Sequence, residues 1–101
     1  YSMISQLRIY TINQGMMESW TKLFTEKIAP IHRKHGMSVE QAWINEANSE
    51  FVWIRSFANA QEMEQKSAAW LELPERKALG NEPNQHIAKR DVRGMDQVNL
   101  N

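Results

Sequence analysis

Residues 51–57 of this 101-residue chain are its most constraining segment, because large apolar side chains occupy both alternating positions of a predicted strand. Successive strand residues point to opposite faces of a sheet, so Phe51 and Trp53 share one face while Val52 and Ile54 share the other. A strand with one face in water normally alternates apolar and polar residues. The segment therefore predicts a sheet that is covered on both faces.

The rest of the chain alternates strand and helix patterns. Strands are expected over residues 4–12, 39–44, 51–57 and 86–92. Helices are expected over residues 15–36 and 59–79, and a loop over residues 81–85. The order strand, helix, strand, strand, helix, strand is typical of an α+β, ferredoxin-like βαββαβ fold, with an antiparallel sheet and both helices on one face.

Three local signals refine the two helices. Met17, Trp20 and Phe24 are spaced by three and four residues, which marks the inner face of the first helix. Pro30 lies inside that helix and lacks an amide hydrogen, so a kink is expected there. Asn59, three residues before Glu62, forms a capping box that predicts the start of the second helix. Its expected inner positions are Met63, Ser67, Trp70 and Leu71.

Two helices can cover only one face of the sheet, which leaves apolar side chains of the other face in water. Burial of apolar surface is worth about 25 cal/mol per Å². A second copy of the chain is the simplest cover, so we expect a two-fold homodimer through the sheet face that closes into an α/β barrel. Residues 1–93 are expected to form the single domain, and residues 94–101 a polar tail that is mobile or reaches the partner chain.

Composition excludes several classes of function. Lys plus Arg equals Asp plus Glu at 12 each, so no net field favours nucleic acid or an anionic membrane. Without cysteine there are no disulfides, thiolate metal sites or cysteine nucleophiles. No segment approaches the roughly 20 apolar residues of a membrane span, and a cytoplasmic protein is expected. Phosphate-binding glycine loops and serine nucleophile motifs are also missing from the sequence.

Several short motifs resemble those of the NIPSNAP family. Residues 6–11, which read Gln-Leu-Arg-Ile-Tyr-Thr and precede Gly15, are similar to the family's opening strand and turn. The first helix, with Pro30 and its Lys-His-Gly ending at Gly36, and the segment 51–70 extend the likeness over roughly residues 4–92. The resemblance implies the dimeric α/β-barrel superfamily, which also contains cofactor-free antibiotic-biosynthesis monooxygenases, haem-degrading enzymes and small isomerases. Their ligands commonly lie between sheet and helices, whereas the NIPSNAP branch itself has no settled chemistry.

His32 and Arg55 are the candidate catalytic residues. His32 lies near the expected kink, where it could position an enolate or bind haem iron, or only complement the helix end. His35 lies three residues further on, but no matching carboxylate or thiol accompanies the pair, so no metal site is predicted. Arg55 interrupts an apolar strand. It is interpreted either as a clamp for a carboxylate or enolate, or as the partner of Glu40, Glu46 or an acid of the partner chain.

Five aromatic residues are candidates for lining a pocket, with core or dimer interface as the alternative reading. They are Tyr10, Trp20, Trp43, Trp53 and Trp70. Two functional hypotheses follow. The first is a small protein that binds or oxidises a flat, apolar or aromatic ligand in a sheet–helix cleft, with no cofactor, as a cofactor-independent monooxygenase or isomerase would. The second is a non-catalytic binding or regulatory homodimer.

Overall fold

The structure, a computed structural model, describes residues 3–100; residues 1, 2 and 101, which fall in the expected domain and tail, lie outside the described residues. The strands are β1 (Ile4–Ile12), β2 (Ser38–Ile44), β3 (Glu50–Phe57) and β4 (Ile87–Asp96). The helical segments are α1 (Met17–Leu23), η1 (Phe24–Ile28), α2 (Ala29–Lys34), α3 (Ala60–Glu72), α4 (Pro74–Ala78) and α5 (Glu82–His86).

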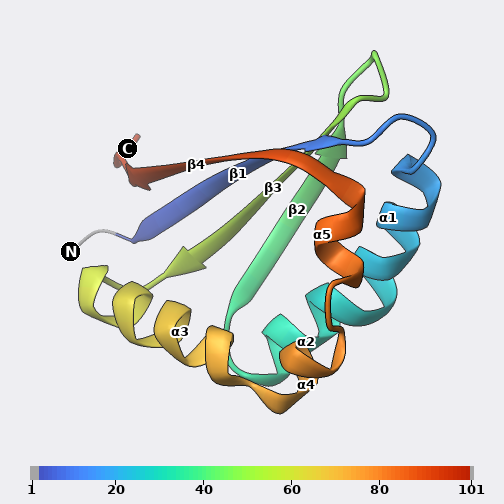
Figure 1. The fold of residues 1–101 in the computed structure, drawn as a ribbon. Coiled ribbons are helices and arrows are strands. Elements are labelled where there is room, and N and C mark those ends of the chain that lie inside the picture. The colour runs from blue at the N-terminus through green and yellow to red at the C-terminus, as the bar shows by residue number, and fades with distance from the viewer. Residues whose placement is uncertain (1–2, 101) are drawn as a thin grey trace.

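The four strands form one antiparallel sheet in the order β2-β3-β1-β4. This topology confirms the predicted α+β, ferredoxin-like fold. In Figure 1 the helical segments all lie on one side of the sheet, as that fold requires. None of the helices in the described part of the chain is long and apolar enough to cross a membrane.

The first helix is continuous from α1 through α2 and contains a π-helical turn, η1, which ends two residues before Pro30, the position of the expected kink. The amide of Ala29 donates to the carbonyl of Phe24, five residues back, immediately before Pro30. Such turns accommodate a local irregularity in a helix, here the proline that has no amide to donate. The π-helical turn places the buried Phe24 and Ile28 toward the sheet, where the Phe24 ring lies 4.7 Å from that of Phe51.

The second helical region differs from the first because it hardly reaches the sheet. No residue of α3 or α4 is buried, and Leu71, expected on the inner face, is 52% exposed. The predicted helix start at Asn59 is confirmed, because its side chain accepts a hydrogen bond of 2.8 Å from the amide of Glu62. The Glu62 carboxylate accepts from the amide of Ala58 at 2.7 Å and not from that of Asn59, so the reciprocal half of the capping box differs. Few apolar side chains are available on α3, so it stands away from the sheet (Figure 1). The space that remains is the cleft described below.

Two segments near the C-terminus differ from expectation. The predicted loop at residues 81–85 is largely the short helix α5, which the sequence concealed because it carries no apolar spacing. The last strand continues past residue 92 to Asp96, and its register pairs Asp96 with Ile4. Residues 94–96 of the expected tail are therefore strand. The backbone of β1 has a free edge along its whole length there, and pairing satisfies those polar groups whatever the side chains are.

The face of the sheet that points away from the helices is apolar at its centre. Strand alternation and register place Leu7, Ile9, Val52 and Ile54 on this face. Trp43 of β2 pairs with Val52 and is 46% exposed. No helix among the described residues covers this surface (Figure 1). The sequence-based expectation of apolar residues on both faces is thus confirmed, with one face left open in the single chain.

Candidate functional site

A cleft of about 500 Å³ lies between the helix-facing side of the sheet and the helical segments α2 to α5. This volume falls within the range of small-molecule sites in proteins, roughly 300 to 1,000 Å³. Arg8, Tyr10 and Trp53 form its floor on β1 and β3, while Trp70 and Arg76 belong to the opposite wall on α3 and α4. The cleft lies where α3 does not pack against the sheet.

Six of the seven candidate residues line this one cleft. They are His32, Arg55, Tyr10, Trp20, Trp53 and Trp70. The exception is Trp43, which lies on the opposite face of the sheet. A β-bulge between Val39 and Gln41 shifts the pairing of β2 with β3, so that Trp43 pairs with Val52. One extra residue reverses the face of every side chain beyond it, which the sequence pattern did not reveal.

Arg55 is buried, at 5% exposure, and its hydrogen-bond partners are neutral. Its Nε donates to Oε1 of Gln6 at 2.7 Å, and its Nη1 donates to Nε2 of His32 at 3.2 Å. Neither Glu40 nor Glu46 forms a salt bridge with it in the described part of the chain, so the intrachain ion pair considered from the sequence is wrong. A buried guanidinium without a carboxylate is costly and calls for a reason.

Arg8 converges on the same amide oxygen. Its Nη1 donates to Oε1 of Gln6 at 3.0 Å, and its Nε donates to the hydroxyl of Tyr10 at 3.0 Å. Burial, together with the charge of Arg8, lowers the pKa of Arg55 to about 10. Arg55 therefore remains charged at neutral pH, and two guanidinium groups share one neutral acceptor.

His32 is neutral and holds Arg55 in place. Its Nδ1 lies 2.9 Å from the carbonyl of Ile28, which can only accept, so Nδ1 carries the proton. The lone pair of Nε2 is then free to accept from Arg55. Burial is the main cause that lowers the pKa of His32 to about 4, and the charges of Arg55 and Arg8 act in the same direction. Both ring nitrogens are engaged in hydrogen bonds, so His32 positions Arg55 and has no nitrogen available to act as a general base.

Guanidinium groups and aromatic rings alternate across the floor of the cleft. Arg55 and Arg8 lie 6.0 and 5.4 Å from the ring of Trp53. Arg8 and Arg90 lie 5.7 and 5.4 Å from the ring of Tyr10. Cation–π contacts of this kind fix the positions of the guanidinium groups, but the rings carry no net negative charge to balance them.

Three buried polar atoms of residues that line the cleft have no hydrogen-bond partner among the described residues. They are Nε1 of Trp20, Nε1 of Trp53 and Oγ of Ser67. More than nine in ten buried polar groups in proteins are hydrogen-bonded, so such a group needs an explanation. All three can donate a hydrogen bond, which adds to the guanidinium groups as sites for an oxygen-bearing ligand.

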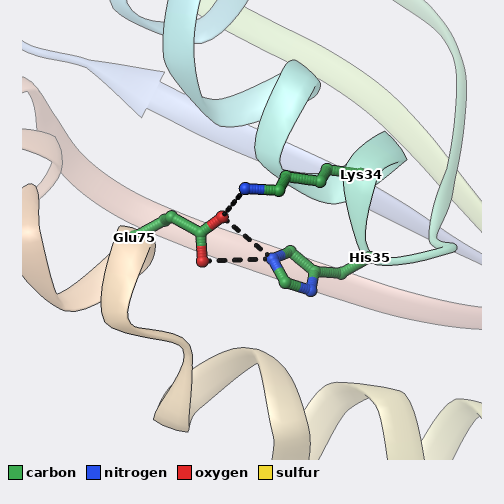
Figure 2. A network of polar contacts seen from close by, with 3 residues as sticks. All are labelled: Lys34, His35 and Glu75. Carbon is green, nitrogen blue, oxygen red and sulfur yellow. Dashed lines mark hydrogen bonds and ion pairs between the residues drawn. The ribbon is translucent and has the colours of Figure 1, made fainter.

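The outer wall of the cleft is attached to α2 by exposed polar contacts (Figure 2). The carboxylate of Glu75 on α4 accepts from Nζ of Lys34 at 2.8 Å and from Nε2 of His35 at 3.1 Å. These hydrogen bonds lower the pKa of Glu75 to about 2. Lys66 of α3 adds a bond of 2.7 Å to the carbonyl of Gly36. His35 therefore anchors the wall rather than entering the cleft with His32.

The third histidine, His86, also takes part in local structure. It is 4% exposed, accepts from the hydroxyl of Ser19 at 2.8 Å and donates to the carbonyl of Glu82 at 2.8 Å. Within residues 3–100 no group of three His, Cys, Asp or Glu side chains is arranged to hold a metal ion. The three histidines thus have different partners and do not form one cluster.

Sequence reasoning missed the residues that complete the cleft. Ser67, Arg76 and Arg90 line it, and Gln6, next to it, is the acceptor shared by two of its arginines. Gln6 shares strand parity with Arg8 and Tyr10, which was a usable signal for that side of the sheet. Arg76 and Arg90 are far apart in the chain and gave no such signal.

Comparison with known proteins supports the fold. The sequence model of the NIPSNAP family matches residues 5–99. A NIPSNAP family protein of Agrobacterium tumefaciens is 19% identical, with 97% of this chain and 95% of that chain covered and a TM-score of 0.86. An uncharacterized NIPSNAP domain protein of Burkholderia xenovorans is 11% identical, with 96% of each chain covered and a TM-score of 0.87.

A further solved structure of similar fold is a putative antibiotic biosynthesis monooxygenase of Caulobacter crescentus. It is 15% identical, with 97% of this chain and 92% of that chain covered and a TM-score of 0.75. No match was found among curated proteins. At these identities the likeness to solved structures shows the fold, and the residues of the cleft must carry any argument about chemistry.

His32 makes stability depend on pH in a predictable way. Its pKa falls from 6.5 to about 4 on folding, so the unfolded chain binds more protons between these values. The free energy of unfolding should therefore fall as pH drops from 6.5 toward 4, by on the order of 3 kcal/mol from this residue. Urea unfolding across this range should show a flatter dependence in His32→Gln than in the parent or in His35→Gln. Parallel curves for the parent and His32→Gln would contradict this assignment.

Glu75 should control how firmly the wall is held. Glu75→Gln removes the charged acceptor of Lys34 and His35, so amide hydrogen exchange should become faster in α4 and the end of α3 while the sheet keeps its protection. Added salt should move the parent toward the variant, because exposed ion pairs are screened. The stabilisation from Glu75 is present above pH 4.5 and is lost as pH falls toward its folded pKa of about 2.

The matched control is Glu72→Gln, which removes an ion pair to Lys77 that lies within the wall itself. Exchange in α4 that is unchanged in Glu75→Gln, or equally fast in both variants, would show that the contact to α2 does not hold the wall.

Proposed function

Because the chain belongs to the NIPSNAP family and its cleft carries unpaired guanidinium groups among aromatic rings, we propose that it binds a small ligand there. The ligand is flat and mostly apolar, and it presents an anionic oxygen group, either a carboxylate or an enolate. Arg55 and Arg8 bind the oxygen, while Tyr10, Trp53 and Trp70 contact the flat body. Two solved NIPSNAP structures to which this chain is similar are described as uncharacterized and as of unknown function, so the proposal rests on the cleft.

The observation that supports this proposal most strongly is the pair of arginines on Gln6. A neutral amide oxygen accepts from both at 2.7 and 3.0 Å, and no Asp or Glu is among the described residues that line the cleft. A ligand carboxylate can replace this weak shared acceptor with charge-assisted hydrogen bonds, which are roughly twice as strong as neutral ones. Ligand binding also accounts for the indole donors that lack a partner.

If the ligand reacts, Arg55 is the residue that stabilises the developing charge. A guanidinium already aimed at the oxygen of an enolate lowers the free energy of the step that forms it. His32 supports this role by fixing Arg55, since its own nitrogens are engaged. The similarity in fold to a putative antibiotic biosynthesis monooxygenase makes cofactor-independent oxidation the first reaction to test, and isomerisation through an enolate the second.

Ligand screening by thermal shift tests the binding proposal. Flat aromatic carboxylates should raise the melting temperature of the parent, because a ligand at 100 times its Kd adds about 2.7 kcal/mol of stability. Their primary amides, which keep the shape and lose the charge, should have little effect. Arg55→Met should lose the response, while Arg93→Met, which changes an arginine outside the cleft, should keep it.

Equal shifts from acids and amides, or an undiminished response in Arg55→Met, would refute the anionic site. Oxygen consumption with each ligand that binds then separates the two functional hypotheses. Uptake that depends on Arg55 supports a monooxygenase, whereas binding with neither oxygen uptake nor an altered product supports the non-catalytic alternative.

We also propose that two copies of the chain associate through the open face of the sheet. The apolar centre of this face, formed by Leu7, Ile9, Val52 and Ile54, has no cover among the described helices. A stable interface buries roughly 800 Å² on each partner, and a four-stranded face can supply such an area. Association there leaves the cleft, on the opposite face, accessible to ligand.

The proposed location is the cytoplasm, consistent with a chain that has no cysteine for disulfides.

The homodimer predicts a specific response to charge on this face. At micromolar concentration the parent should sediment as two chains, and Ile54→Lys should sediment as one, since a buried ammonium at the interface would be desolvated without a partner. Val98→Lys, at a residue that is 73% exposed outside the sheet, should remain a dimer. A parent that sediments as a folded single chain would refute the proposal.

A further inference from the structure

We propose that the ligand carries a second anionic group, and that Arg76 and Arg90 bind it at the mouth of the cleft. This inference rests on the proposed function, since it extends the same site, and it narrows the ligand class to flat molecules with two acidic groups. Carboxylate and phosphate share the chemistry that a guanidinium pair recognises. The first acidic group occupies Arg55 and Arg8, and the second lies toward the outer wall.

Arg76 and Arg90 come from different elements and line the same cleft. Arg76 lies on α4, in the wall, and its Nη1 has a long contact of 3.4 Å to the carbonyl of Leu71. Arg90 lies on β4, at the edge of the floor, and donates to the amide oxygen of Asn84. Neither arginine has a carboxylate partner in the described part of the chain. The cleft is thus lined by four arginines and neutral acceptors.

Ion pairs with carboxylates do occur outside the cleft. Lys34, Lys66, Lys77 and Arg93 each form a salt bridge with a carboxylate outside the cleft. The contrast is sharpest on β4 itself. Arg93, on the opposite face of the sheet, pairs with Asp91 at 2.9 Å, whereas Arg90 takes only an amide. None of the 12 acidic residues of the chain is among the described residues that line the cleft.

Tyr10 lies near one arginine of each proposed anion site. Arg8 and Arg90 lie 5.7 and 5.4 Å from the centre of its ring, so a flat ligand beside this ring has two guanidinium groups nearby. The register supports this arrangement, because Arg90 pairs directly with Tyr10 across β1 and β4. Arg8 donates to Gln6 and to the Tyr10 hydroxyl, whereas Arg90 donates to Asn84, so the two arginines have different partners. The two sites are therefore distinct and can be occupied by one small molecule.

Solvation of Arg90 is the competing explanation, since this side chain is exposed. Water can satisfy one exposed arginine at little cost. It accounts less well for four positive groups around a single cavity, because like charges repel each other more strongly where the walls exclude water. A dianion would relieve this repulsion at both ends of the cleft. A monoanion would leave Arg76 and Arg90 without a charged partner.

The experiment compares dicarboxylates with their monomethyl esters by titration calorimetry. The ligands are terephthalate and naphthalenedicarboxylate, each with its monomethyl ester, and carboxyphenyl phosphate as a phosphate-bearing analogue. In the parent, each diacid should bind at least roughly tenfold more tightly than its ester, the size of one charge-assisted hydrogen bond. In the double variant R76Q/R90Q this advantage should shrink to about twofold or less, while the affinity for the esters stays unchanged.

R93Q is the matched control, because it removes an arginine of the same strand on the other face, and it should keep the full advantage. Arg90→Gln alone should lose part of the advantage and Arg90→Lys, which keeps the charge, should keep most of it; this pair replaces the double variant if that variant fails to fold. A larger gain for carboxyphenyl phosphate than for terephthalate assigns the outer site to phosphate, and the reverse assigns it to carboxylate.

The outcomes separate this inference from the proposed function. If diacids and esters bind equally in the parent, or if R76Q/R90Q keeps the advantage, the second anion site is overturned. Loss of both ligands in R55M would then leave the proposed function standing. If none of the acids binds the parent, the proposed function falls as well.

Discussion

The hydrogen bonds that Gln6 accepts from Arg8 and Arg55 are the interaction on which this site depends. They hold two positive charges on the helix-facing side of the sheet without neutralising either. Removing a guanidinium from water costs several kcal/mol unless it is paired, and an ion pair to a carboxylate would be the usual remedy. Here the protein provides an amide, a neutral histidine and aromatic faces. The two guanidinium groups therefore stay charged without a carboxylate partner, and an anionic ligand would supply one.

The cleft exists because the two helical regions are unequal in apolar content. The first helix presents Trp20, Phe24 and Ile28 to the sheet and packs tightly against Phe51 and Trp53. The second presents little beyond the half-buried Trp70, and none of its residues is buried. Burial of apolar area decides how closely a helix can approach a sheet, so α3 and α4 stay at a distance and are held by exposed polar contacts such as those of Glu75. Trp70 of α3 also packs on His32, with ring centroids 3.9 Å apart, so an aromatic contact joins the wall to α2 as well.

Much of the architecture could be predicted because it depends on local patterns. Apolar spacing predicted the first helix, the capping box at Asn59 predicted the start of α3, and both parities of β3 predicted a sheet with two apolar faces. Six of the seven candidate residues meet in one cleft, although the sequence left open which face of the sheet meets the helices. The register of β1 with β3 places Tyr10, Trp53 and Arg55 on the same face. Trp43 escaped this reasoning since the bulge in β2 reverses its face, and α5 escaped it since a polar segment of five residues has no periodicity. The prediction of an intrachain acidic partner for Arg55 was wrong, because tertiary packing decides which distant side chain lies next to it.

The sequence by itself determined the order of the strands and helices, the family and the presence of a charge within an apolar strand, because each of these depends on residues that are near one another in the chain. Only the tertiary structure decided what that charge contacts. Gln6 is 49 residues from Arg55, and His32 is 23 residues from it, and these distances in sequence are spanned by packing alone. The same is true of Arg90, which reaches the cleft through its pairing with Tyr10. Hydrogen bonds and burial between distant residues set the chemistry of the site, and no pattern within a single strand or helix contains that information.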